Sequence, residues 1–295
     1  MAAVPTFVIP KRTLTWLVTG SSSGFGLEIV RQVQRSGHRV IATSRNPART
    51  PELVREVEAQ GGKWVQLDVN DLDSTKLVKE LESSGEHIDV LVNNAGYAIY
   101  QAGEHFTEEE VRAQMDTLYF APFRLIRAVL PYMRKRRFGT IVNISSGASL
   151  EGRESMSAYA GPKAALDGLS RVLAKEVAPF NIRILTVVCG VFNTNLLKSA
   201  ILGKEPIDDD YKGSVADETM KTMASGLMPA DGDKVKAAGA IRDVVLGKGV
   251  GAGHESERLL PLGRDMVPRF KLARDRLDHA LQVFEGVATN VYIDK

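Results

Sequence analysis

The chain has 295 residues, of which 44% are hydrophobic and 25% charged, fractions typical of a globular protein. It carries 38 Lys and Arg against 36 Asp and Glu, and a net charge of +2 argues against bulk electrostatic binding of nucleic acid. The single cysteine, Cys189, excludes an internal disulfide framework and favours a reducing, cytoplasmic setting. No apolar run approaches the roughly 20 residues of a membrane helix, and the five His show no ligand spacing. We therefore expect no membrane or nucleic-acid partner and no metal.

Short apolar runs alternate with amphipathic stretches along the chain. The runs are rich in Val and Ile, and several lack polar alternation, which is typical of strands covered on both faces. They span 14–19, 39–43, 64–69, 88–92, 140–145 and 182–188, and a shorter one follows at 258–262. Strands that alternate with helices predict right-handed crossovers and a parallel sheet. We therefore predict an α/β fold, a Rossmann-like doubly wound parallel sheet of about seven strands with helices on both faces.

One predicted helix carries clear start and break signals. Thr107–Glu110 has the form of a capping box and starts a stretch that runs to Arg137. Pro122 and Pro131 lie inside it, so we expect a break near one of them.

The pattern weakens after the sixth run. Residues 193–230 show no firm period, and so long a stretch is usually functional or mobile. A helix over 233–246, the strand at 258–262 and a last helix follow, the last with an apolar face of Phe270, Leu277, Leu281 and Phe284. We predict one domain over 1–295, in which 195–230 covers the substrate and 258–295 forms the C-terminal strand and helix.

A glycine-rich turn, TGSSSGFG at 19–26, joins the first run to a helix. Glycines let the backbone approach a pyrophosphate, and a helix N-terminus offers free N–H groups and partial positive charge. The spacing differs from the commoner G-x-G-x-x-G, and a plain Gly/Ser loop is the alternative. Its place after the first strand favours nucleotide binding, with contacts from Gly20, Ser22, Ser23, Gly24, Phe25 and Gly26.

The turn resembles the TGxxxGxG motif of the short-chain dehydrogenase/reductase family, and further family motifs follow in order between residues 13 and 195. Residues 93–96 read NNAG, Ser146 precedes Tyr159 by the family's spacing, and 159–163 form a YxxxK. The resemblance implies a nicotinamide cofactor. It places Asp68 beside the adenine and adds Asn94, Val191 and Thr194 as cofactor contacts.

The end of the second run bears on the choice of cofactor. An acidic side chain there would accept the 2′-hydroxyl of NAD, whereas an Arg can pair with the 2′-phosphate of NADP. Residues 42–46 read ATSRN, without Asp or Glu, and Arg45 can grip a phosphate bidentately. We favour NADP(H) over NAD, with a solvent-facing Arg45 as the alternative.

The resemblance also assigns the reacting residues. Tyr159 is the expected proton donor or acceptor, Lys163 lowers its pKa and holds the ribose, and Ser146 orients the carbonyl. Four residues apart on a helix, Tyr159 and Lys163 share a face, and a nearby cation lowers a phenol pKa from ~10. The predicted reaction moves a hydride between NADP(H) and a carbonyl or secondary alcohol of a small to mid-sized substrate. Family members are often homodimers or homotetramers.

Two positions depart from the family. Leu118 stands where members carry an Asn thought to hold a proton-relay water, and Leu cannot form hydrogen bonds through its side chain. We hypothesise that a backbone carbonyl freed near Pro122 holds the water instead. Cys189 replaces a Pro, and we expect a buried structural thiol. A non-redox isomerase, dehydratase or cyclase on this scaffold remains an alternative, as does a non-catalytic NADP-binding regulator.

Overall fold

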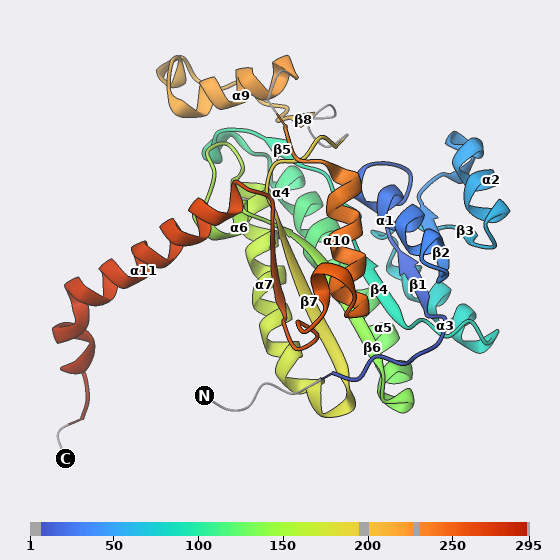
Figure 1. Cartoon of the computed structure of the whole chain (residues 1–295). Coiled ribbons are helices and arrows are strands. Elements are labelled where there is room, and N and C mark those ends of the chain that lie inside the picture. Colours follow the sequence, from blue (N-terminus) through green and yellow to red (C-terminus); the bar gives the residue numbers. More distant parts are fainter. Residues whose placement is uncertain (1–6, 195–200, 227–229, 294–295) are drawn as a thin grey trace.

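The computed structural model describes residues 7–194, 201–226 and 230–293, and its centre is a parallel sheet (Figure 1). All seven predicted runs enter it, in the order β3-β2-β1-β4-β6-β7-β9, and every neighbouring pair is parallel. The strands are β1 (Thr15–Val18), β2 (Arg39–Ser44), β3 (Lys63–Gln66), β4 (Val90–Asn93), β6 (Gly139–Ser146), β7 (Ile182–Cys189) and β9 (Leu259–Leu262). The predicted doubly wound fold is confirmed.

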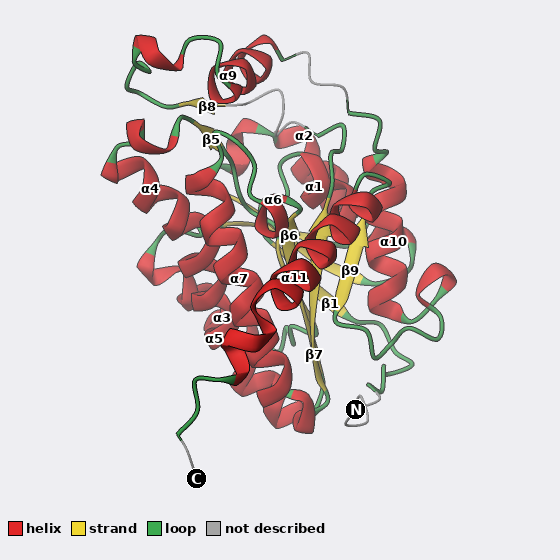
Figure 2. Cartoon of the chain, turned by 90° about the vertical axis from the view of Figure 1, so that its left-hand side faces the viewer, coloured by secondary structure: helices red, strands yellow, loops and turns green. Residues whose placement is uncertain are grey.

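Helices cover both faces of this sheet, as the edge-on view in Figure 2 shows. One core lies beneath α1 (Gly24–Arg35) and α10 (Lys234–Leu246), and the other beneath α3 (Thr75–Ser83), α5 (Ala121–Arg136) and α7 (Ser157–Glu176). The remaining α-helices are α2 (Pro51–Ala59), α4 (Glu108–Met115), α6 (Ala148–Glu151), α9 (Val215–Ser225) and α11 (Met266–Thr289). Two buried layers explain why the strands are rich in Val and Ile and several lack polar alternation.

The long predicted helix breaks where Pro122 required it. The capping box is present, since the Thr107 hydroxyl accepts from the Glu110 N–H at 3.2 Å and the Glu110 carboxylate accepts from the Thr107 N–H. A π-helical turn, η4 (Asp116–Phe120), separates α4 from α5, whereas Pro131 lies inside α5 without ending it. Because Pro122 has no N–H, it cannot donate to the Leu118 carbonyl, four residues earlier.

Three local features differ from the sequence expectations. β3 ends at Gln66, three residues short of the predicted end. Two-residue strands β5 (Ile99–Tyr100) and β8 (Ile201–Leu202) form a small separate sheet. Within residues 193–230, for which the sequence predicted no element, α9 is capped at its N-terminus by Ser214, whose hydroxyl accepts from the Asp217 N–H.

The C-terminal helix α11 forms as predicted but projects from the body rather than lying on the sheet (Figure 1). Met266, at its first residue, is its one buried side chain. Within the described ranges, no helix is long and apolar enough to cross a membrane.

Candidate active site

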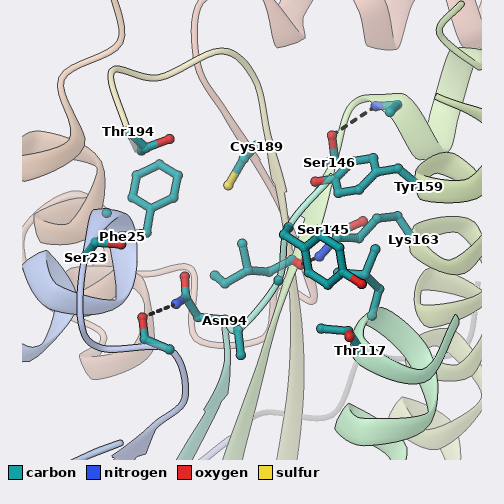
Figure 3. A pocket seen from close by; sticks show the side chains of 18 of the residues that line it. Ser23, Phe25, Asn94, Thr117, Ser145, Ser146, Tyr159, Lys163, Cys189 and Thr194 are labelled. Carbon is teal, nitrogen blue, oxygen red and sulfur yellow. Dashed lines mark hydrogen bonds between the residues drawn. The ribbon is translucent and has the colours of Figure 1, made fainter. Parts of the chain in front are cut away.

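A cavity of about 410 Å³ opens at the carboxyl ends of the central strands. Ligands of open α/β sheets bind at this edge. In Figure 3, Ser23, Phe25 and Thr194 lie at one side of the cavity, and Ser146, Tyr159 and Lys163 at the other. Every residue that the sequence predicted for the site lines this cavity except Gly26, which is buried beneath it: the lining includes Gly20, Ser22, Ser23, Gly24, Phe25, Arg45, Asp68, Asn94, Ser146, Tyr159, Lys163, Val191 and Thr194.

The glycine turn depends on the absence of side chains. Gly20 has φ +68°, and a Cβ there would lie 2.8 Å from the Ala95 Cα, while a Cβ on Gly26 would overlap the Gly20 carbonyl. The Asn94 amide donates to the carbonyls of Thr19 and Gly20, at 2.9 and 3.2 Å. Asn94 and Gly26 therefore maintain the conformation of the turn. This role toward a cofactor is indirect and adds to the direct contacts predicted for them.

The start of α1 is open to an anion. Its first turn, described in full, contains no acidic residue, and Ser23 makes no side-chain capping bond. Ser22, Ser23 and Gly24 line the cavity, so the free N–H groups of the helix start lie at its wall. This donor set fits the pyrophosphate of a dinucleotide.

Two charged residues line the same end of the cavity. Arg45 is exposed and directly follows β2, and Asp68 lies two residues beyond β3, where it accepts a bond from the Asn70 N–H at 3.0 Å. No ion pair involving Arg45 occurs among residues 7–194, 201–226 and 230–293, so its guanidinium can bind an incoming phosphate.

Tyr159 and Lys163 project from the first turns of α7, which begins at Ser157. Both side chains are buried, and the Lys163 ammonium lies 5.8 Å from the centre of the Tyr159 ring. Lys163 Nζ donates to the Ile144 carbonyl at 2.6 Å. Pro162 lies in the second turn of α7.

Burial dominates the protonation of this pair. It lowers the pKa of Lys163 to about 8, because desolvation disfavours the ammonium. It raises the pKa of the Tyr159 phenol, against the nearby Ser146 hydroxyl, which lowers it. That Lys163 lowers the phenol pKa stays a prediction, and in this structure its ammonium is bonded to the Ile144 carbonyl.

Comparisons with known proteins agree with this geometry. The family model of the short chain dehydrogenases matches residues 15–204. The chain belongs to this family. The oxidoreductase claN of Passalora fulva is 44% identical over 182 residues, which are 61% of this chain and 83% of that protein. A 3-ketodihydrosphingosine reductase of Bacteroides thetaiotaomicron is 41% identical over 178 residues, 60% of this chain and 64% of that protein. A solved short-chain dehydrogenase from Streptomyces avermitilis superposes with a TM-score of 0.84, at 34% identity, over 96% of this chain and all of that one.

The short-chain dehydrogenase site is closed at one wall by Leu118, which is buried in the π-helical turn and lines the cavity. Its neighbour Thr117 accepts a hydrogen bond from the Asn70 amide at 2.9 Å. The side chain of Leu118 offers no polar atom at the position of the family's Asn.

Two further polar residues at the site lay outside the sequence prediction. Ser145 is buried and lines the cavity. Asp167, one turn beyond Lys163, accepts from the Ser149 hydroxyl at 2.6 Å, and burial raises its pKa. A carboxyl four residues after the YxxxK lysine was the available signal, because both then share a face of α7.

Cys189 is buried at the end of β7, where burial raises the pKa of its thiol to about 12. The turn that follows is held by the C-terminal helix, since the Asp265 carboxylate accepts from the Val191 N–H at 3.2 Å. Arg269 lines the cavity and pairs with both Asp265 and Glu151. Within the described ranges no group of three His, Cys, Asp or Glu could hold a metal.

The predicted covering segment is only partly visible. Its parts at 195–200 and 227–229 lie outside the described residues, and none of residues 201–226 lines the cavity. Met223 of α9 is nevertheless buried against Tyr100, Met156 and Tyr159. The segment therefore packs on the outer side of the wall that carries Tyr159.

Proposed function

We propose that this chain is an NADP-dependent reductase or dehydrogenase that moves a hydride between NADP(H) and a carbonyl or secondary alcohol. One observation carries the proposal: Tyr159, Lys163 and Ser146 share one wall of the cavity whose other end is formed by the glycine turn and the uncapped start of α1. A ligand that reaches from the turn to Tyr159 would place its reactive end beside the phenol.

The chain's own residues account for the proton. Ser146, whose hydroxyl oxygen accepts from the Ala148 N–H at 3.2 Å, still has its O–H to donate to a substrate carbonyl. Tyr159 would pass its proton to the same oxygen as negative charge develops there. When bound, the nicotinamide supplies the hydride at carbon, and its oxidised form adds positive charge near the phenol.

Lys163 would hold the ribose and supply charge. Its ammonium has three N–H donors. One donates to the Ile144 carbonyl, so two are left for ribose hydroxyls or water. The Leu118 carbonyl, to which Pro122 cannot donate, is the proposed acceptor for a water that returns a proton to Lys163. The relay then needs no side chain at position 118.

The preference for NADP rests on Arg45. Arg45 follows β2 directly and lines the cavity. The end of β2 carries no Asp or Glu that could accept the 2′-hydroxyl of NAD. A guanidinium binds phosphate with two parallel hydrogen bonds. We infer that the 2′-phosphate occupies this position.

Absorbance of NADPH during incubation with a panel of ketones tests the function. The panel should include 3-ketodihydrosphingosine, since one relative is named as its reductase. Net oxidation with formation of the alcohol supports the proposal. Conversion without net oxidation would identify the isomerase, dehydratase or cyclase alternative, and binding without conversion would identify the regulator.

A further inference from the structure

The helix α11 leaves the body as an extended arm. Every residue from 274 to 293 is exposed, including Leu277, Leu281 and Phe284 at 63%, 66% and 60%. Figure 1 shows the arm running outward beyond α6 and α7, and in Figure 2 it lies in front of the body. A helix that packs against nothing is only marginally stable in water, because most helical stability comes from the packing of an apolar face. The arm therefore calls for a partner surface.

Its apolar side chains follow a seven-residue repeat. Phe270, Leu277 and Phe284 recur every seven residues, and each is followed three residues later by a second apolar side chain. We call these six positions the arm stripe: Phe270, Ala273, Leu277, Ala280, Phe284 and Val287. Apolar residues at alternate spacings of three and four form the seam through which two helices pair.

The root of the arm is fixed, so the stripe is presented in one direction. Met266 is fully buried, and Arg269 forms ion pairs with Glu151 at 2.5 Å and Asp265 at 3.1 Å. Two turns further, Arg276 donates to the Leu150 carbonyl at 3.3 Å. These contacts bind the root of the arm to α6, which follows β6. The arm is thus a positioned surface, not a loose tail.

The described body offers no apolar surface of matching length. Its other exposed large apolar side chains occur one or two to an element, such as Leu72, Val172 and Val250. A second arm, by contrast, carries a stripe of the same length and spacing. We propose that α11 of one copy pairs in antiparallel orientation with α11 of a second copy of this chain.

Charge selects the antiparallel orientation. Residues 266–276 carry four Lys and Arg against one Asp, whereas residues 277–293 carry Asp278 and Glu285 and no Lys or Arg. Antiparallel pairing lays the basic half of each arm along the acidic half of the other, while parallel pairing would set basic against basic. It also opposes the two helix dipoles.

The sizes of the stripe residues fix a register. When Leu277 of one arm meets Ala280 of the other, Ala273 meets Phe284 and Phe270 meets Val287, and two-fold symmetry repeats these layers. Phe284 and Leu277 each lie against an alanine, which lets the helices interdigitate. All six stripe positions are then used, and every layer is apolar.

Sedimentation velocity of the full chain tests the pairing, with a double charge substitution in the stripe. Leu277→Glu with Phe284→Glu should convert the assembly to a species of half the mass. The matched control, Gln282→Glu with Thr289→Glu, adds the same charge to the opposite face of the helix and should keep the wild-type mass. NADPH binding to both variants reports that the sheet domain is folded. A wild type that is monomeric at micromolar concentration, or a stripe variant with unchanged mass, overturns the proposal.

Disulfide trapping tests the orientation. A mixture of Ala273→Cys chains with Phe284→Cys chains should give a covalent mixed dimer, and neither variant alone should cross-link. Cross-linking of each variant with itself would show parallel pairing and overturn the antiparallel arm. Flotation with phosphatidylcholine/phosphatidylserine vesicles tests whether the stripe binds a lipid surface instead. Wild-type protein that floats as a monomer, while the stripe variant does not, would replace the second copy by a lipid surface.

Discussion

Replacing Lys163 by methionine removes a buried ammonium and should change how stability depends on pH. The pKa of Lys163 is 10.5 in the unfolded chain and falls to about 8 in the folded one. Each pKa unit corresponds to about 1.4 kcal/mol, so the ammonium costs the folded state about 3 kcal/mol at pH 7. This cost is fully present below pH 8, decreases as the pH rises, and disappears above pH 10.5.

The assay is denaturant unfolding of wild type and Lys163→Met at pH 7 and at pH 10.5. The difference in unfolding free energy between the two proteins should change by about 3 kcal/mol, with wild type relatively weaker at pH 7. Methionine also leaves the Ile144 carbonyl without its donor, but that loss does not depend on pH and cancels between the two conditions. Lys175→Met, on the same helix, reports what removing an exposed ammonium does to the same measurement.

A difference that stays constant within about 1 kcal/mol between pH 7 and 10.5 would refute the reasoning. It would mean that the Lys163 ammonium is not desolvated. The amine would then be an ordinary surface cation, and the enclosed charge that the proposed chemistry needs beside Tyr159 would be absent.

Three further outcomes follow from the site. Gly26→Ala should raise the Kd for NADPH at least tenfold, because its Cβ would overlap the Gly20 carbonyl, while Gly161→Ala, with open space at its Cβ, should leave binding unchanged. Arg45→Ala should weaken NADPH binding by about ten- to a hundredfold, the equivalent of a charged hydrogen bond, with NADH binding altered less than threefold; equal losses would exclude the phosphate contact. Cys189 should resist alkylation by iodoacetamide at pH 8 until the protein unfolds, since burial raises its thiol pKa to about 12, and rapid labelling of the native protein would contradict this.

The sheet could be predicted from the sequence because its strands are buried on both faces. Runs such as 140–145 and 182–188 are rich in Val and Ile without regular polar alternation, and the structure extends both only by one or two residues. The break before α5 was equally readable, since Pro122 lacks an N–H wherever it stands. β5 and β8 were not, because two residues cannot show a period and their pairing joins segments a hundred residues apart.

The site was predictable in its membership but not in its protonation. Motif spacing identified thirteen lining residues, yet it could not show that the Ile144 carbonyl holds the Lys163 ammonium. A backbone acceptor leaves no mark in the side-chain sequence. The apolar face of α11 was predicted correctly. The sequence could not show that this face is exposed, because periodicity indicates that a face is apolar and not what covers it.

The most direct test of the proposed chemistry is the turnover of Tyr159→Phe with NADPH and a ketone that the wild type reduces. The phenyl ring keeps the packing against Met156 and Met223 and removes the proton that the carbonyl oxygen must receive. The rate should fall by at least about a hundredfold, the usual scale of one general acid, while NADPH binding by fluorescence stays within about threefold. Undiminished turnover would show that the proton comes from elsewhere, and Tyr159 would lose its place in the reaction.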